Sequence, residues 1–275
     1  MSSMIDLDYL QACRLLLPST NEVDITLIGC GGTGSWLAPS IVRVARLLQE
    51  KFQKCIRVTF VDPDQVEQKN CYRQNFCLAE VGHNKAEALA TRYGLAWGVP
   101  VTWFPQPFRS TQNHQNELKL YIGCVDNAEA RKAICKAVAG HYSSSVLDWW
   151  LDCGNHKAAG QVLLGCGHNR PARPFELTGF CSWLPLPSQQ HPELLTLQPE
   201  TQTSEEGLSC ADLAMLDSQG LAINQRIAAE ATDYLVRMLL TRDLHKFATY
   251  VDLVSGAARS RYITPASVST ETVDS

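Results

Sequence analysis

A glycine-rich turn near the start of the chain has the spacing of a phosphate-binding loop. Gly29, Gly31 and Gly34 fit the pattern G-x-G-x-x-G within "ITLIGCGGTGSWLAPSI". The first glycine permits a tight turn, the second lets the backbone approach phosphate, and the third lets helix and strand pack closely. Phosphate would lie at the helix N-terminus, where free N–H groups and the dipole favour an anion. The turn predicts a nucleotide site, with a purely structural glycine turn as the alternative.

Polar residues after the second predicted strand bear on which nucleotide is bound. Asp62 ends "IRVTFVD", where an acid binds a ribose hydroxyl. Arg73 and Lys85 follow, placed beyond the carboxyl ends of the strands and near the expected phosphates. Nucleotidyl transfer needs such cations on a triphosphate, whereas hydride transfer does not. The joint spacing favours phosphate binding over two ordinary surface cations.

Asp126 follows the fourth predicted strand in "GCVDNAEAR". It could hold Mg²⁺ through one carboxylate while the metal bridges phosphates. The alternative is that Asp126 caps the helix that begins at "AEARKAI", because Asp is a favourable N-cap residue. The local sequence leaves both interpretations open.

These side chains need a frame that brings strand ends together, and the chain alternates strand-like and helix-like segments. Predicted strands are "DITLIG", "IRVTFVD", "VPVTWFP", "KLYIGCVD", "SSVLDWWLDCG" and "AGQVLLGC". Helices are predicted over residues 36–52, 84–93 and 128–139, the first from apolar residues at three-to-four spacing. This alternation implies right-handed crossovers. We expect an α/β, Rossmann-like fold with a mainly parallel sheet and helices on both faces.

The last part of the chain breaks this rhythm. Residues 168–209 are rich in proline and have few periodic apolar positions, so we expect a long irregular segment, either functional or a plain surface excursion. A helix is predicted from Gln219 to about Leu240. The segments "HKFATYVDLVSG" and "SRYITP" then predict a closing antiparallel hairpin, followed by a frayed tail.

Composition and charge exclude several classes of function. The 275 residues are 45% apolar and 19% charged, as in ordinary globular proteins, with a net charge of −4. This charge gives no bulk attraction to nucleic acid or to an anionic membrane. No apolar run approaches the ~18 residues that span a bilayer, and the N-terminus carries acids instead of the basic residues of a signal peptide. We expect a cytoplasmic protein.

Eleven cysteines are present, but none forms a C-x-x-C motif, because the nearest pair is Cys71 and Cys77. We therefore predict no structural zinc. Most of these thiols are expected to be reduced and buried.

Four stretches, taken in order, resemble one family. They are "GCGGTGS" (residues 29–35), "DPDQVEQKNCYRQ" (62–74), "VGHNK" (81–85) and "CVDNAEAR" (124–131). This set resembles the ThiF/MoeB family, the ubiquitin-activating-enzyme-like adenylyltransferases. In particular, the glycine turn, "GQVLLG" and the "SC" before the last helix resemble the compact ThiF-related proteins of the PRTRC cassette.

The resemblance implies a ThiF-type fold and an ATP-consuming activity. In such enzymes, ATP with Mg²⁺ activates the C-terminal glycine carboxylate of a small ubiquitin-like or sulfur-carrier protein. Asp62 would bind the ribose, and Asp126 would hold Mg²⁺. Asn70, Arg73 and Lys85 would contact phosphates. The whole nucleotide-binding set implied is Gly29, Gly31, Gly32, Gly34, Asp62, Asp64, Asn70, Arg73, Gln74, Lys85, Asp126 and Asn127.

Two further catalytic residues are implied by the resemblance. Cys210, in "EEGLSCADLAML", stands where thioester-forming relatives carry their cysteine, and Cys181 is a second candidate. A packed, unreactive cysteine is the alternative, since a nucleophilic thiol needs an exposed setting and a lowered pKa. Arg14 would be supplied to the site of a partner subunit in a homodimer. A conjugating enzyme is a further possible partner, and the chain's acidity disfavours nucleic acid.

The chain then divides into five parts. These are an N-terminal arm (1–22), an ATP-binding adenylation region (23–167), an irregular crossover or substrate-docking segment (168–209), a C-terminal helix and strands that complete the same domain (210–265), and a tail (266–275).

Three other functions remain open at this point. An NAD(P)- or FAD-linked oxidoreductase explains the glycine turn and Asp62 but leaves Arg73, Lys85 and Asp126 without a role. A non-catalytic ThiF-fold binding module has no physical need for those side chains. A third alternative is adenylation of a peptide or of a tRNA-borne carboxylate.

Overall fold

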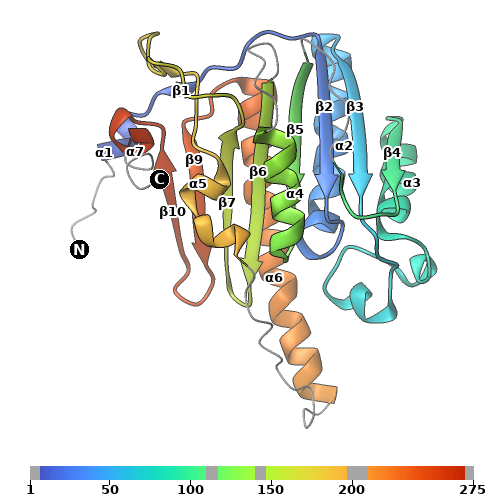
Figure 1. Cartoon of the computed structure of the whole chain (residues 1–275). Coiled ribbons are helices and arrows are strands. Elements are labelled where there is room, and N and C mark those ends of the chain that lie inside the picture. Colours follow the sequence, from blue (N-terminus) through green and yellow to red (C-terminus); the bar gives the residue numbers. More distant parts are fainter. Residues whose placement is uncertain (1–6, 110–116, 140–146, 197–209, 270–275) are drawn as a thin grey trace.

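An eight-stranded mixed sheet forms the frame of the protein (Figure 1). The computed structural model describes residues 7–109, 117–139, 147–196 and 210–269, without the side chains of 210–219. The strand order is β10-β9-β7-β6-β5-β2-β3-β4. The strands are β2 (Glu22–Ile28), β3 (Cys55–Val61), β4 (Val101–Phe104), β5 (Glu117–Gly123), β6 (Leu147–His156), β7 (Ala159–Cys166), β9 (Lys246–Asp252) and β10 (Ala257–Tyr262).

The type of strand pairing changes once across this sheet, from parallel to antiparallel at β6. The strands from β6 to β4 run parallel to one another, and β7, β9 and β10 continue the sheet in antiparallel fashion. The α/β class, the mainly parallel sheet and the C-terminal antiparallel extension predicted from the sequence are therefore confirmed.

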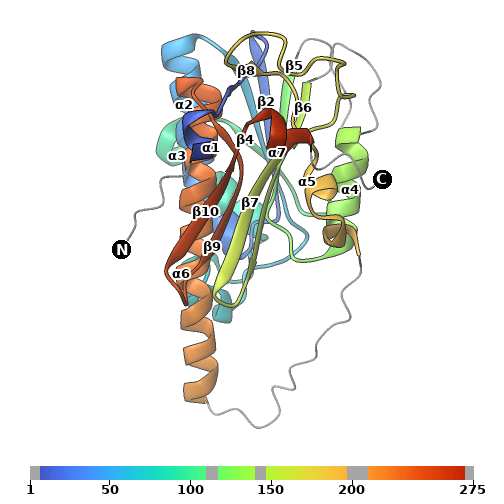
Figure 2. The same ribbon diagram turned by 90° about the vertical axis from the view of Figure 1, so that its left-hand side faces the viewer.

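Helices cover both faces of the sheet (Figure 2). The α-helices are α1 (Leu7–Leu10), α2 (Gly32–Phe52), α3 (Lys85–Trp97), α4 (Ala128–Ala139), α5 (Pro187–Gln190), α6 (Cys210–Leu235) and α7 (Pro265–Ser269). Four short helical turns, η1 (Gln68–Tyr72), η2 (Leu78–Glu80), η3 (Pro192–Leu195) and η4 (Val236–Thr241), and a two-stranded pair, β1 (Arg14–Leu15) with β8 (Phe180–Cys181), complete the description. Helices α2, α3 and α6 lie on one face, and α4 and α5 lie on the other.

Alternation along the strands supplies a core on each face. In β2, Ile25 and Leu27 are fully buried in the larger cluster, which includes residues of α2 and α6. Ile28 points to the opposite face and belongs to a smaller cluster with Ile134 of α4 and Trp150 of β6. The two-residue period of strands thus gives a sheet that is apolar on both faces, as a doubly covered sheet requires.

The C-terminal part differs in detail from the prediction. Helix α6 begins at Cys210 instead of Gln219, and the expected frayed tail is helical in α7, where Val268 is buried. The irregular segment holds only β8, α5 and η3, and residues 197–209 lie outside the described part. None of the helices in the described ranges is both long and apolar enough to cross a membrane.

Candidate functional site

A cavity of about 1020 Å³ opens at the carboxyl ends of β2, β3 and β5. It also receives residues from η1, from the start of α3, from the hairpin between β6 and β7, and from α6. The predicted binding residues that line it are Gly29, Gly31, Gly32, Asp62, Asp64, Asn70, Arg73, Gln74, Lys85, Asp126 and Asn127. The fold thus brings almost the whole predicted set into one place. Gly34 alone does not line the cavity.

The three predicted glycines of the turn differ in how much space surrounds them. Gly29 has a φ of +87°, and a Cβ there would lie 2.5 Å from the carbonyl oxygen of Cys124. A Cβ on Gly34 would lie 1.9 Å from the carbonyl oxygen of Gly29. At Gly31 the nearest atom would be Gln74 Nε2 at 3.8 Å, so the space in front of this residue is open.

The N-terminus of α2 faces this open space without a side-chain cap. Its N-cap residue is Gly31, which has no side chain to accept a hydrogen bond from the first turn of the helix. The first backbone N–H groups of a helix have no acceptor within the helix. Gly31, Gly32 and Thr33 line the cavity, so these donors and the helix dipole are available to an anion.

Asp62 ends β3 as a buried carboxylate with fixed donors. Its Oδ2 accepts a hydrogen bond from the Cys30 N–H at 2.6 Å, and its Oδ1 accepts one from the Asp64 N–H at 2.8 Å. Burial raises the pKa of Asp62, while the two backbone donors and the Lys85 ammonium lower it. A carboxylate oxygen has more than one acceptor position, so the side chain can still accept from a ribose hydroxyl.

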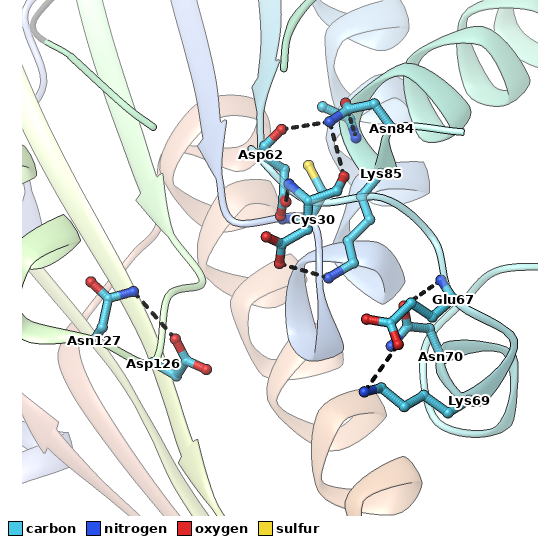
Figure 3. Close-up of polar contacts among 11 residues, drawn as sticks. Cys30, Asp62, Glu67, Lys69, Asn70, Asn84, Lys85, Asp126 and Asn127 are labelled. Carbon is cyan, nitrogen blue, oxygen red and sulfur yellow. Dashed lines mark hydrogen bonds and ion pairs between the residues drawn. The ribbon is translucent and has the colours of Figure 1, made fainter. Parts of the chain in front are cut away.

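Lys85 enters the cavity from the first turn of α3 (Figure 3). Its ammonium pairs with Asp64 Oδ2 at 2.9 Å, and its side chain is 10% exposed. The preceding Asn84 caps α3 by accepting hydrogen bonds from the next turn and donates to the carbonyl oxygens of Asp62 and Asp64. Asn84 thereby ties the loop after β3 to α3 and fixes where Lys85 starts.

Turn η1 positions the three polar residues of "NCYRQ". Asn70 is buried, and its side-chain oxygen accepts from the Glu67 N–H at 2.8 Å. The carbonyl of Arg73 accepts from Trp36 Nε1 at 3.3 Å. Gln74 is also buried, and its Oε1 has no hydrogen-bond partner within the described residues. A buried acceptor without a partner is unusual, and here it borders the cavity.

The structure separates the two roles that the sequence left open at Asp126. The side-chain oxygen of Asn127 accepts from the Ala130 N–H at 2.8 Å, so Asn127 is the cap of α4. Asp126 is exposed at the cavity, where Asn127 Nδ2 lies 3.4 Å from its Oδ1 (Figure 3). The capping interpretation of Asp126 is therefore wrong, and its role as a metal ligand stays a prediction.

A cluster of polar side chains that was not predicted from the sequence also lines the cavity. Asn155 of β6 donates to Thr33 Oγ1 at 3.2 Å and also to Asn224 Oδ1 of α6. Thr33 donates to the same Asn224 oxygen at 3.3 Å, and Asn224 Nδ2 donates to the Arg73 carbonyl at 3.4 Å. An Asn beside the apolar residues Ile223 and Ile227 was the available signal, because a polar residue that borders a buried helix face needs partners.

The roles of Arg14 and Cys210 that the resemblance implies remain predictions. Arg14 is exposed in β1. In Figure 1, β1 lies near the amino ends of the parallel strands, whereas the cavity is lined by residues at their carboxyl ends. Cys210 begins α6, and its side chain lies outside the described residues. Cys181 is buried in β8, and burial raises the pKa of its thiol to about 11. That setting excludes Cys181 as the exposed nucleophile that was considered.

The residues around the cavity fit a Mg²⁺ ion carried by a nucleotide, with one protein carboxylate. No group of three or more His, Cys, Asp or Glu side chains in the described ranges could hold a metal by itself. Mg²⁺ in nucleotide sites uses one or two carboxylates together with phosphates and water. Asp126 places one such carboxylate on the cavity side.

Comparison with known proteins places this geometry in context. The ThiF family model matches residues 16–160. Among solved structures, PaaA has a TM-score of 0.54 at 15% identity, over 89% of this chain and 65% of that one. Escherichia coli MccB with succinimide has a TM-score of 0.54 at 13% identity, over 89% of this chain and 64% of that one. MccB with AMPCPP and MccA has a TM-score of 0.51 at 13% identity, over 94% and 66%.

These identities show a shared fold alone. The chain spans a little under two thirds of the length of each of these structures. A search of curated proteins found no match.

Proposed function

The chain belongs to the ThiF family, and on that premise we propose that it uses ATP to adenylate a carboxylate. The observation that carries the proposal is one cavity that combines the open N-terminus of α2, the carboxylate of Asp62, and the cations Arg73 and Lys85. An anion at the helix N-terminus with two cations beside it suits a triphosphate. A dinucleotide used for hydride transfer gives no role to that charge.

The proposed reaction is a displacement at the α-phosphate. A carboxylate oxygen of the substrate attacks the α-phosphorus of ATP, the bond to the bridging oxygen of pyrophosphate breaks, and an acyl adenylate forms. This chemistry depends on alignment and charge neutralisation more than on a proton-transferring base. Asp62 orients the ribose, the α2 N-terminus holds phosphate, and Arg73 and Lys85 stabilise the departing pyrophosphate.

Asp126 would hold the Mg²⁺ ion, which supplies further charge neutralisation on the phosphates when bound. The assignment is supported by the exposed carboxylate on the cavity side and by the transfer of the capping role to Asn127.

The substrate that carries the carboxylate would bind in a second cavity, apart from the nucleotide cavity. A second cavity of about 660 Å³ lies on the same face of the sheet as α4, between the β6–β7 and β9–β10 hairpins. Asn155 and His156 line both cavities. Arg131, Gln161, Tyr250 and Arg259 also line the second cavity, where Asp152 holds Arg131 at 3.1 Å. An extended chain lying there would bring its terminus to the nucleotide.

We propose that the extended segment in the second cavity is the C-terminal tail of a substrate protein. This substrate is a small ubiquitin-like or sulfur-carrier protein that ends in glycine. The support is the family membership, together with a second cavity that shares the lining residues Asn155 and His156 with the nucleotide cavity. The neighbour MccB was crystallised with both AMPCPP and MccA, which is consistent with a polypeptide as acceptor. The same proposal includes two later steps, a thioester on Cys210 and transfer to a conjugating enzyme. It also includes a homodimer as the working form of the protein.

ATP–pyrophosphate exchange with purified protein tests the proposal. The reaction contains Mg²⁺, labelled pyrophosphate and one of several ubiquitin-like proteins ending in glycine. The matched control is the same protein with its terminal glycine removed. Exchange is expected only with the intact tail. Absence of exchange with every tail, together with tight binding of NAD(H), would show that the fold serves redox chemistry instead.

A further inference from the structure

The hairpin between β6 and β7 carries a lysine that has no role in the mechanism above. Lys157 lies in this turn, which reaches the same end of the sheet as the carboxyl ends of β2, β3 and β5 (Figure 1). Its side chain lines the nucleotide cavity. The two residues before it, Asn155 and His156, line both the nucleotide cavity and the second cavity. Lys157 therefore directly follows the two residues that the two cavities share.

The cluster of Asn155, Thr33 and Asn224 fixes this hairpin over the glycine turn. Thr33 belongs to the first turn of α2, and Asn155 donates to its Oγ1 at 3.2 Å. Two residues of extended chain span at most about 7 Å, so the backbone of Lys157 stays within that distance of Asn155. The phosphate-binding turn and the hairpin lysine thus line the same cavity and are linked through Asn155.

The charge of Lys157 is not used elsewhere in the described structure. Lys69 pairs with Glu67 at 3.0 Å, and Lys85 pairs with Asp64 at 2.9 Å. No ion pair joins Lys157 to any side chain of the described ranges, although it borders the same cavity. An ammonium at a cavity edge without a carboxylate partner is available to an anionic ligand.

The backbone at this position is also unusual. Lys157 has a φ of +25°, in a region that a residue with a Cβ rarely adopts. Such a conformation costs free energy and persists where surrounding contacts impose it, often at a binding site. Here the tight turn accounts for it, because only Lys157 and Ala158 lie between the paired residues His156 and Ala159, and two-residue hairpin loops use positive φ.

We propose that Lys157 is a catalytic residue whose ammonium binds the α-phosphate and the incoming carboxylate where these two anions meet. The inference rests on the proposed adenylation. Two anions must approach each other before the new oxygen–phosphorus bond forms, and a fixed cation between them lowers that repulsion. Lys157 stays protonated throughout, while the carboxylate oxygen bonds to phosphorus and pyrophosphate departs.

Four variants separate the charge of Lys157 from its backbone. Lys157→Gln removes the charge, Lys157→Arg keeps it, and Lys157→Gly removes the charge while relieving the positive φ. Lys132→Gln, at an exposed lysine of α4 that lines neither cavity, is the matched control. Displacement of a fluorescent ATP analogue measures the affinity of each protein for adenosine, AMP and 5′-O-(glycylsulfamoyl)adenosine, a stable mimic of an acyl adenylate.

Adenosine lacks the α-phosphate, so its affinity should stay the same in all five proteins. Lys157→Gln and Lys157→Gly should each weaken AMP and the acyl-adenylate mimic by about tenfold, as the loss of one charge-assisted contact does. Lys157→Arg should stay within about threefold of the wild type, and Lys132→Gln should be unchanged.

Two results would overturn the inference and are distinguishable from failure of the proposed function. If Lys157→Gln and Lys157→Gly bind AMP and the mimic as tightly as the wild type, Lys157 does not contact the α-phosphate, although nucleotide binding stands. If the wild type binds neither ATP analogue nor AMP, adenylation itself is excluded, and the inference falls with it. Melting temperatures of all variants show whether each is folded, and Lys157→Gly keeps the test open if the Gln variant is not.

Discussion

Two carboxylates at the cavity differ in the surroundings that the fold gives them. Asp62 is buried and accepts two backbone hydrogen bonds, which fix its direction. Asp126 is exposed, and a neighbouring amide is its only hydrogen-bond contact within the described residues. A fixed carboxylate suits a hydroxyl that must be oriented, and an exposed carboxylate suits a hydrated cation.

The pair Asp126 and Asn127 allows binding and capping to be measured separately. Asn127→Ala removes the cap of α4 and should lower the free energy of unfolding by about 1 kcal/mol. Asp126→Ala should leave stability nearly unchanged but raise the Mg²⁺ concentration needed for half-maximal ATP–pyrophosphate exchange by at least about tenfold. Denaturant unfolding and a Mg²⁺ titration of exchange give the two readouts. A loss of stability in Asp126→Ala with a normal Mg²⁺ response would return the capping role to Asp126.

Lys85 affects both the phosphates and Asp62, since its ammonium lowers the pKa of that carboxyl. Lys85→Met keeps the aliphatic stem and removes the charge. Exchange should fall by about 100-fold or more, the scale of losing one preorganised electrostatic contact. The acidic limb of the residual activity should also move to higher pH, because the pKa of Asp62 rises without the ammonium. Lys132→Met is the control, and an unshifted acidic limb would separate Lys85 from Asp62.

At the scale of elements, α2 packs closely on the glycine turn that follows β2, and the closest backbone contact is between Gly34 and Gly29. Gly34→Ala places a Cβ against the Gly29 carbonyl at 1.9 Å, and a backbone atom cannot rotate away. We expect a loss of about 3 kcal/mol or more in the free energy of unfolding. Gly31→Ala meets only the Gln74 side chain at 3.8 Å, although the ψ of −128° at this position is unfavourable for a residue with a Cβ, so we expect a smaller loss of stability than for Gly34→Ala. It should nevertheless bind ATP more weakly, because the methyl group enters the space before the helix N-terminus.

Chemical denaturation and displacement of a fluorescent ATP analogue check this pair of variants. A stable Gly34→Ala protein would mean that the close packing of α2 on the turn is not required. Unchanged ATP affinity in Gly31→Ala would place the phosphates elsewhere in the cavity.

Elements and motifs were predictable where the signal is local. Helix α4 occupies the predicted residues 128–139, because its apolar positions and the preceding Asp-Asn boundary lie in one short stretch. The cluster of Thr33, Asn155 and Asn224 joins residues 122 and 191 positions apart. No periodicity records such a contact, so the residues on either side of the cavity were predicted as motifs, while the side chains that connect them were not.

The whole molecule carries a row of charges at the end of the sheet opposite the cavity. Arg57, Asp24, Lys119 and Asp148 are register partners on four adjacent strands, so cations and acids alternate on one face. Burial raises the pKa of Asp24 to about 6 and that of Asp148 to about 7. Both carboxylate oxygens of Asp148 are buried without a hydrogen-bond partner in the described ranges.

This row predicts that stability falls as pH rises. Both acids have a folded-state pKa above the ordinary value of 3.8, so folding favours their protonated forms. The stabilisation of the folded state by the protonated forms of Asp24 and Asp148 is fully present below about pH 4. It is lost as the pH rises through the folded-state pKa values of about 6 and about 7. Denaturant unfolding at pH 5, 6, 7 and 8 should show this decline, and Asp148→Asn should flatten it.

The control for the pH dependence is Asp252→Asn. Hydrogen bonds from Ser255 and Val254 lower the pKa of Asp252, so this group titrates below the tested range. The variant should shift stability by a constant amount and keep the slope. A slope that survives in Asp148→Asn would assign the pH dependence to other groups.

The cavity also bears on how many chains one active site needs. Arg14 is exposed on β1, near the amino ends of the strands, so within one chain it lies across the sheet from the nucleotide cavity. If Arg14 acts on phosphate, as the family resemblance implies, a second copy of the chain must supply it, as a symmetric homodimer does.

Mixing experiments test this arrangement without a structure of the dimer. Arg14→Ala and Lys85→Met should each lose exchange activity, since either change leaves every site incomplete. After unfolding and refolding together, mixed dimers contain one site with both residues, so part of the activity should return. Lys85→Met mixed with Asp126→Ala is the control, because both residues line the same cavity and no mixed dimer has a complete site. No recovery in the mixture of Arg14→Ala with Lys85→Met, or full activity of Arg14→Ala alone, would show that the sites do not use the arginine of a partner.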